Sequence, residues 1–298
     1  MKKFLKGCFI TAGVLILIGI LMTIICVSFG GGKVFWEAVK NNEFSLVRTD
    51  LWNGAMQARV RIDDKDFDWC EDFDDFDDWN LLNGELHKSG NQEQVVIGSK
   101  EEVSSLTCEI GAAQFEILES PDDNYRLDYN IKNKLGYRIT EGKLTIRGVE
   151  KNVGHNDKIY LYVPKDTVLD AVWISLGAGK AEVRGLKCKE LIADIGAGKI
   201  DFINMETGDT DINVGAGQID FEGRITGDIN ANCAMGQIDI EVKGNESFWN
   251  YDLNCAAGQI EINDREYSGL LNDVYTDNNA ENECALDCAM GQIEFSCE

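Results

Sequence analysis

The chain has 298 residues, of which 44% are apolar, and its 52 acidic and 28 basic side chains give a formal net charge of −24 at pH 7. This length is sufficient for one large or two small domains with a packed core. The negative charge excludes nucleic acid from the expected partners, because nucleic-acid binding needs lysine and arginine to neutralise phosphates. It favours cations or basic surfaces instead.

The first predicted element is a transmembrane helix within residues 1–32, which follows a short cytoplasmic stub. No charged side chain occurs in residues 7–32, and the apolar run Phe9 to Phe29 has 21 residues, which covers roughly the 30 Å of a bilayer core. A cleaved signal peptide is the rival interpretation, because the basic start MKK resembles an n-region. Against it, the apolar run exceeds a usual h-region and no A-x-A site follows. A lipoprotein site at Cys26 is less favoured still, because two isoleucines precede it.

The orientation of this helix is predicted from its flanks. Three basic residues precede it and three follow within about 20 residues, so the positive-inside count is tied. The compact basic start ahead of a long C-terminal region is typical of a signal anchor. We therefore expect a single-pass protein of the cell membrane with its C-terminal domain extracytoplasmic.

Residues 33–94 are predicted to form a juxtamembrane segment with an acidic-aromatic spacer. Between Asp63 and Asp78 there are ten acids and one lysine, interleaved with aromatic residues. Calcium binding is one interpretation, since calcium prefers several oxygen ligands, but the segment lacks the glycine and spacing of an EF-hand loop. The other is a self-repelling spacer that lifts the following domain off the membrane.

Residues 95–298 contain an internal repeat. The aligned copies read CEIGAAQFEI, ISLGAGKAEV, ADIGAGKIDF, INVGAGQIDF, ANCAMGQIDI, LNCAAGQIEI and LDCAMGQIEF. Their turn positions are Ala113, Gly179, Gly198, Gly217, Gly236, Gly258 and Gly291, and the four copies from Gly179 to Gly236 follow one another at a constant spacing. Regular repeats of this kind are typical of solenoids. The insertion between Asp264 and Glu283 interrupts the spacing and is expected to project as a loop.

Side chains within each copy alternate with period two, as in half-buried strands. Around Gly217 the apolar and polar side chains face opposite ways. The apolar side chains are Ile212, Val214, Ile219 and Phe221, and the polar ones are Asn213, Gln218 and Asp220. A 19-residue unit cannot bury its apolar face alone, but stacked units can. The predicted fold is therefore all-β, a β-solenoid or β-helix-like repeat domain with about 19 residues per coil, preceded by the single transmembrane helix.

The glycines are predicted to be structural. A Walker loop needs Ser or Thr after its lysine, whereas Ala181 and Ile200 stand there, and a dinucleotide fingerprint needs a helix where strands follow. We expect the glycines to occupy bends with φ values that are costly for other residues.

Most cysteines of the repeat domain stand at positions where the other copies carry inward-facing apolar residues. Cys233, Cys255 and Cys288 take the position of Leu176, Ile195 and Val214 in other copies. They are interpreted as small buried hydrophobic side chains. Structural disulfides are the alternative, because stacked coils lie about 5 Å apart.

An outward column carries acids in every coil, in the order Glu182, Asp201, Asp220, Asp239, Glu261 and Glu294. Carboxylates this close repel one another unless they are screened. The column is either a solvated face or a surface for cations or a basic partner. Asp201, Asp220, Asp239 and Glu261 are the candidate metal ligands, with calcium as the candidate ion; no other cofactor is expected.

The run KIYLYVPKDTVLDAVWISLGAGKAEVRGLKCKELIADIGAGKIDF resembles the bacterial putative-adhesin family with β-strand repeats, also called domain of unknown function 4097. The matching features are the strand ending in Pro164-Lys165-Asp166 and the recurring GAG turn. The resemblance spans roughly residues 95–298. It implies a solenoid-like domain at the cell envelope with no established reaction.

The predicted function is a non-enzymatic surface interaction or adhesin module for an unknown protein or glycan. An envelope sensor or accessory subunit working with a membrane partner is the alternative, and a glycan-active enzyme on a β-helix is favoured least. No catalytic residues are assigned, because repeated outward acids do not single out a catalytic pair. The last coil is expected to end the solenoid uncapped, which would favour self-association through that end.

Overall fold

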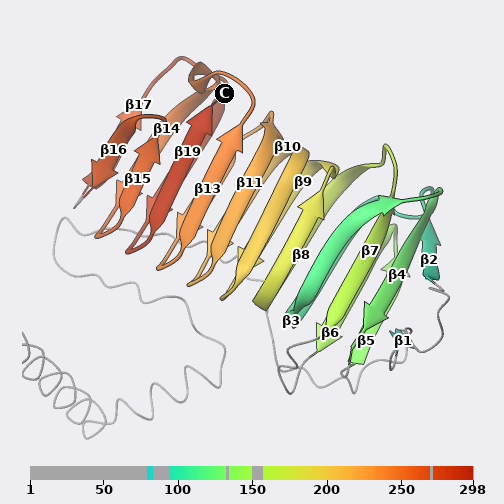
Figure 1. Ribbon diagram of the computed structural model, residues 1–298. Coiled ribbons are helices and arrows are strands. Elements are labelled where there is room, and N and C mark those ends of the chain that lie inside the picture. The colour runs from blue at the N-terminus through green and yellow to red at the C-terminus, as the bar shows by residue number, and fades with distance from the viewer. Residues whose placement is uncertain (1–78, 83–93, 132–133, 150–156, 269–270, 298) are drawn as a thin grey trace, which may run out of the picture. The chain divides into compact units, whose positions relative to one another are not determined.

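The computed structural model describes residues 79–82, 94–131, 134–149, 157–268 and 271–297. Within them the chain is all-β, as predicted (Figure 1). The strands are β1 (Asn80–Leu82), β2 (Val95–Ser99), β3 (Ser105–Ser120), β4 (Asn124–Asn130), β5 (Lys134–Thr140), β6 (Lys143–Val149), β7 (Lys158–Pro164), β8 (Val168–Arg184), β9 (Lys187–Ile195), β10 (Lys199–Val214), β11 (Gln218–Ile225), β12 (Ile229–Cys233), β13 (Gln237–Val242), β14 (Trp249–Cys255), β15 (Gln259–Ile262), β16 (Arg265–Ser268), β17 (Leu271–Thr276), β18 (Asn282–Cys288) and β19 (Gln292–Cys297).

The predicted transmembrane helix and the acidic-aromatic spacer up to Asp78 lie outside the described residues. Among the residues that the structure does describe, no helix has the length and apolar character needed to cross a bilayer. Strand β1 lies within the predicted juxtamembrane segment 33–94, just after the spacer, and pairs antiparallel with β5.

The predicted 19-residue coil is confirmed by the strand register. Lys199 of β10 pairs with Gln218 of β11, and Gln218 pairs with Gln237 of β13, all in parallel. Each coil therefore supplies one strand before its glycine turn and one after it. We call the two resulting layers the pre-turn sheet (the start of β8, β9, the end of β10, β12, β18 and β14) and the post-turn sheet (the end of β8, the start of β10, β11, β13, β19 and β15).

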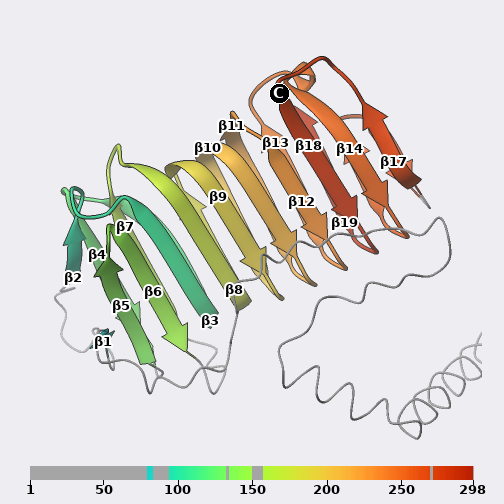
Figure 2. The same cartoon turned by 180° about the vertical axis from the view of Figure 1, so that it is seen from behind.

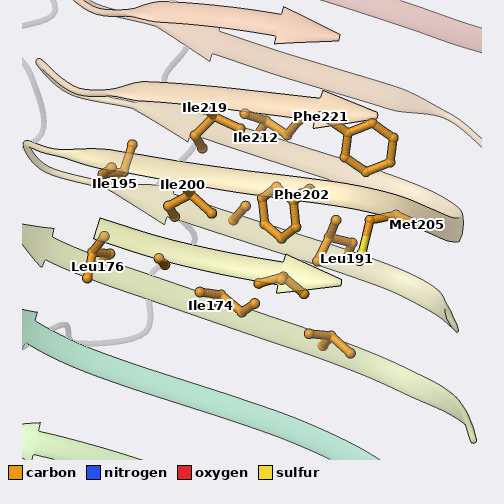
Figure 3. Packing of buried hydrophobic residues seen from close by; sticks show 14 of the residues in the cluster. Ile174, Leu176, Leu191, Ile195, Ile200, Phe202, Met205, Ile212, Ile219 and Phe221 are labelled. Atoms are coloured by element: carbon orange, nitrogen blue, oxygen red, sulfur yellow. The ribbon is translucent and has the colours of Figure 1, made fainter. Parts of the chain in front are cut away.

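The core lies between these two sheets, because alternate side chains of each strand point inward. In β11 every second residue is buried. Figure 3 shows side chains from both sheets meeting in this space, among them Ile174, Leu191, Ile195, Ile200, Phe202, Ile212, Ile219 and Phe221. The rings of Phe202 and Phe221 pack between neighbouring coils with centroids 6.0 Å apart. Each such side chain contributes about 1.5–3 kcal/mol through burial.

The N-terminal end of the solenoid is built around β3, which contributes to both layers. Its first half pairs with β6 and its second half with β7, both in parallel. Antiparallel strands continue each layer outward, β5 beside β6 and β4 beside β7. Ala113 pairs with Gly179, so the seventh repeat copy aligns as predicted.

The C-terminal coils are not stacked in chain order. Strand β18 pairs with β12 on one side and with β14 on the other, and β19 likewise lies between β13 and β15. Figure 1 shows β19 between β13 and β15, and Figure 2 shows β18 between β12 and β14. We call β18 and β19 the intercalated segment, because it fills a position between two coils that precede it in the sequence.

Two expectations about this end are wrong. The insertion between Asp264 and Glu283 does not simply project as a loop, because β16 pairs antiparallel with β15 and β17 with β14. The last coil in the sequence is therefore not the last in space. The outermost coil is β14 and β15, and the antiparallel strands β16 and β17 lie along it. Its edges are thus covered by short strands from the insertion, a common way to protect a sheet edge.

Candidate interaction surfaces

The outer face of the post-turn sheet carries a continuous row of carboxylates. Strand alternation turns these side chains outward, opposite the buried isoleucines of the same strands. In spatial order the carboxylate row is Glu116, Glu182, Asp201, Asp220, Asp239, Glu294, Glu261 and Glu266. The sequence predicted Glu182, Asp201, Asp220, Asp239, Glu261 and Glu294. It missed Glu116 and Glu266, which lie at the two ends of the row, and it placed Glu261 before Glu294. Intercalation reverses that order.

At its N-terminal half the carboxylate row is neutralised by lysines. Lys199 Nζ lies 2.8 Å from Asp201 and 2.6 Å from Asp220, and Lys180 Nζ lies 3.3 Å from Asp201. Burial alone would raise the pKa of Asp201, but hydrogen bonds from Lys199 and Lys180 outweigh it and lower that pKa. The same contacts raise the pKa of Lys199. In this half of the row, lysine charges therefore compensate the carboxylate charges.

At its C-terminal half glutamine replaces lysine, so the negative charge is not compensated within the row. Gln218, Gln237 and Gln292 stand in register where Lys180 and Lys199 stand earlier. The pKa of Asp239 is raised by its burial and by the neighbouring carboxylates of Glu294 and Asp220. A row of carboxylates about 5 Å apart attracts positive charge.

The candidate metal ligands are only partly brought together. Asp201, Asp220 and Asp239 are register neighbours, whereas Glu294 separates Asp239 from Glu261. Within the described ranges, no group of three or more carboxylate, histidine or cysteine side chains is arranged to hold a metal ion. The Asp201 carboxylate already forms ion pairs with Lys180 and Lys199.

The outer face of the pre-turn sheet carries a second row, which the sequence analysis missed. Asn213 Nδ2 donates to Asp194 Oδ1 at 2.8 Å, and Asn232 Nδ2 donates to Asn213 Oδ1 at 3.0 Å. Trp173 Nε1 donates to the other Asp194 oxygen at 2.8 Å. Burial raises the pKa of Asp194. The signal was present in the aligned copies, most of which carry Asp or Asn at this outward position before the turn.

The turn glycines allow neighbouring coils to approach closely. Positive φ values of 115° and 114° occur at Gly179 and Gly198, which confirms the expectation there. Gly217, Gly236, Gly258 and Gly291 do not share this conformation. At all six positions an added Cβ would lie closer than 3.0 Å to a backbone oxygen of the neighbouring coil. Close packing, more than backbone conformation, therefore explains the glycine column.

The cysteines of the described repeat lie on the inward side and are not joined by a disulfide. Cys108, Cys188, Cys233, Cys255, Cys284 and Cys288 are buried, and Cys297 is half-buried. This placement agrees with the interpretation of small buried hydrophobic side chains.

Comparisons with known proteins point to one family and to several solved structures. The sequence model of the family described as Toastrack DUF4097 matches residues 103–272, which is more than half of the chain. A crystal structure of a putative cell adhesion protein from Clostridium sporogenes ATCC 15579 is 13% identical, with a TM-score of 0.39 over 69% of this chain and 98% of that one.

Two other crystal structures, both of putative adhesins, match in the same range. The one from Parabacteroides distasonis ATCC 8503 is 11% identical, with a TM-score of 0.35 over 73% of this chain and 100% of that one. The one from Parabacteroides merdae ATCC 43184 is 12% identical, with a TM-score of 0.30 over 72% and 98%. The comparison with curated proteins gave no match.

Proposed function

Because the chain belongs to the Toastrack DUF4097 family, we propose that it is a membrane-anchored, extracytoplasmic interaction module of the adhesin type, without enzymatic activity. The observation that carries this proposal is the regularity of the two outer faces. Their side chains repeat in register from coil to coil. Such extended faces suit the binding of a macromolecule better than the conversion of a small substrate.

The lack of enzymatic activity is supported by the same regularity. A hydrolytic site on a β-helix needs two carboxylates in different environments, one acting as an acid and the other as a base or nucleophile. Here the outward acids of the C-terminal half share one environment, beside glutamines and other acids. The acids that differ from these are Asp201 and Asp220, and they are held in ion pairs with Lys180 and Lys199.

The expected partner is a protein with a basic surface. The C-terminal half of the carboxylate row offers Asp239, Glu294, Glu261 and Glu266 on adjacent strands without a lysine or arginine between them. In the N-terminal half of the row the carboxylates of Asp201 and Asp220 already form ion pairs with Lys180 and Lys199. Attraction should therefore concentrate on strands β13, β19 and β15, and should weaken as salt is added.

Photo-crosslinking in intact cells tests this proposal. A photoreactive residue placed at Gln292 samples the acidic half of the carboxylate row, and one placed at Asp252 samples the pre-turn sheet, where that side chain is exposed. We expect salt-sensitive protein adducts from position 292, and fewer of them when Glu294→Gln and Glu261→Gln are combined.

The matched control combines Asp252→Asn with Glu281→Gln, which removes two charges from exposed positions away from the row. Adducts at position 292 should survive in this control. Adducts that depend equally on both pairs would show a non-specific charge effect and overturn the assignment of the face. Recovery of membrane regulators in place of extracellular proteins would favour the sensor or accessory-subunit function instead.

A further inference from the structure

Three cysteines lie side by side at the turn edge of the pre-turn sheet. Cys233 of β12 pairs in register with Cys288 of β18, and Cys288 pairs with Cys255 of β14. Neighbouring strands are about 4.8 Å apart, which falls within the range of roughly 4.4–6.8 Å for Cα separations that a disulfide spans. The repeat therefore places thiols on adjacent coils at bonding range, with Cys288 as the central member.

The local contacts distinguish Cys233 from the other two. Proximity to the Cys288 thiol and to the N–H groups of Gln292 and Gly236 lowers the pKa of Cys233 despite its burial. Burial instead raises the pKa of Cys255. The lowered pKa makes Cys233 the member of the pair that forms the thiolate more readily, and the thiolate is the nucleophile of thiol–disulfide exchange.

The position of the sulfur atoms agrees with reaction between coils. The Cys233 sulfur leans against Gly291 of the next coil, and the Cys288 sulfur leans in the same direction against Gly258, so that an added Cβ at either glycine would overlap a sulfur atom. On the turns that follow the two cysteines of the pair, Met235 and Met290 are both 61% exposed. The thiol pair thus lies directly beneath an exposed turn edge, and opening of these turns gives an oxidant access.

We propose that Cys233 and Cys288 form an inter-coil disulfide that fastens the intercalated segment to the coils that precede it. The Cys233 thiolate attacks the disulfide of an oxidant, such as oxidised glutathione or a protein disulfide, and one oxidant sulfur leaves as a thiol. Cys288 then loses its proton and displaces the second oxidant sulfur. Two protons and two electrons pass to the oxidant, which ends as two thiols, and one S–S bond forms in the chain.

The position of this bond gives it a mechanical role. Cys288 lies in the last coil of the sequence, and its partner Cys233 lies much earlier in the chain, in a coil of the regular array. A covalent bond there restricts the unfolded chain and opposes withdrawal of the intercalated segment from its position. The alternative bond, between Cys288 and Cys255, would join that segment only to the outermost coil.

Peptide mapping of the full chain tests the pairing. The reduced protein in detergent is incubated with oxidised glutathione, alkylated and digested with trypsin without reduction. We expect a linked pair of peptides 225–243 and 266–298, which persists when Cys255→Ser is introduced and when Cys284→Ser and Cys297→Ser are combined. It should disappear with Cys288→Ser. A dominant link between 244–265 and 266–298, or no link at all after prolonged oxidation, would overturn the proposal.

A second measurement is made first on the natural chain, where it does not depend on how the variants fold. Oxidation of the natural chain should raise its thermal midpoint by roughly 10 °C, and reduction should reverse the change. The shift should be kept by Cys255→Ser and lost by Cys288→Ser. An unchanged midpoint in a chain that carries the 233–288 link would contradict the fastening role.

Discussion

The regular coils β8 to β13 and the C-terminal coils β14 to β19 use the same repeat in different ways. In the regular coils each strand pairs with the corresponding strand of the next coil in the sequence, as Ile219 does with Ile200 and Ile238. In the C-terminal coils β18 instead reaches past β14 to an earlier partner, as Cys288 does with Cys233. Nearest-neighbour contacts make the stability of a repeat array roughly additive, whereas the intercalated segment joins two parts that would otherwise be separated.

The largest expected effect follows from removing residues 282–298. The deletion takes away the buried side chains of the intercalated segment and leaves β12 and β14 without the strand between them. Five buried residues, Cys284, Leu286, Cys288, Ile293 and Phe295, represent roughly 10 kcal/mol of burial, comparable with the whole stability of a typical domain. We expect residues 243–276 to lose protection in hydrogen exchange.

The control is the removal of one whole regular coil. Deleting residues 199–217 joins Gly198 to Gln218, so the sequence reads IGAGQIDF and the register continues. This longer deletion should leave a cooperatively folded domain with one coil fewer, because solenoid repeats contact mainly their neighbours. If the two deletions had equal effects on exchange, the distinction between regular and intercalated coils would be wrong.

The turn glycines give the next largest effect and separate the two regions again. Gly198 combines a φ of 114° with close contact to the backbone of the preceding coil, whereas Gly291 has the close contact alone. Gly198→Ala should cost about 3 kcal/mol or more and Gly291→Ala about 1–3 kcal/mol in urea unfolding.

Gly185→Ala is the matched control for this pair. Gly185 has a positive φ of 64° with open space around it, so an added methyl group meets strain but no overlap. The expected cost is about 1 kcal/mol. A Gly198→Ala variant as stable as Gly185→Ala would show that backbone conformation, and not the approach of the neighbouring coil, explains the glycine at position 198.

Much of the regular array could be predicted from the sequence, because its period is strict. The alternation of Ile219 and Phe221 with polar residues gives the strands, and the constant spacing of the copies gives the stacking of Gly198 and Gly217 on adjacent coils. The carboxylate row follows from the same register. The row at Asp194 and Asn213 follows from it as well, but it mixes acids with amides and therefore lacks the uniform charge that made the carboxylate row conspicuous.

The order of the C-terminal coils could not be predicted in the same way. The copies ANCAMGQIDI and LDCAMGQIEF share the run CAMGQI and the same alternation around it, so local pattern cannot tell which of them Leu253 and its coil should stack against. The choice depends on contacts between residues far apart in the chain. The strands β16 and β17 of the insertion pair with the outermost coil. They could not be predicted from the repeat because their sequences do not follow it.

A smaller effect is expected from replacing Lys199 with the glutamine that later coils carry. Lys199 bridges Asp201 and Asp220, and Lys199→Gln would extend the uncompensated half of the carboxylate row into the regular coils. The expected loss is about 0.5–1 kcal/mol in urea unfolding, reduced at high salt. Lys189→Gln removes an exposed lysine with a single partner, Asp170, and should cost less. Equal losses would show that the row does not act as a network.

The smallest expected effect is a pH dependence from Asp239. Its pKa is raised by burial and by the carboxylates of Glu294 and Asp220, so the folded state binds this proton more readily than the unfolded state does. Its contribution to stability therefore increases as the pH falls from neutrality through the raised pKa, and stops changing below the unfolded value of about 4.

Asp239→Asn should remove this contribution and raise the free energy of unfolding at pH 7 by about 0.5 kcal/mol, since one like-charge contact is lost on each side of the row. Urea unfolding at pH 7 and pH 5 measures it. The gain from the substitution should be smaller at pH 5 than at pH 7, because protonation has already relieved part of the repulsion in the natural chain.

Asp220→Asn is the contrasting case, since it removes a partner of Lys199 and should lower stability at both pH values. A gain from both substitutions would show that the two halves of the carboxylate row do not differ in charge compensation.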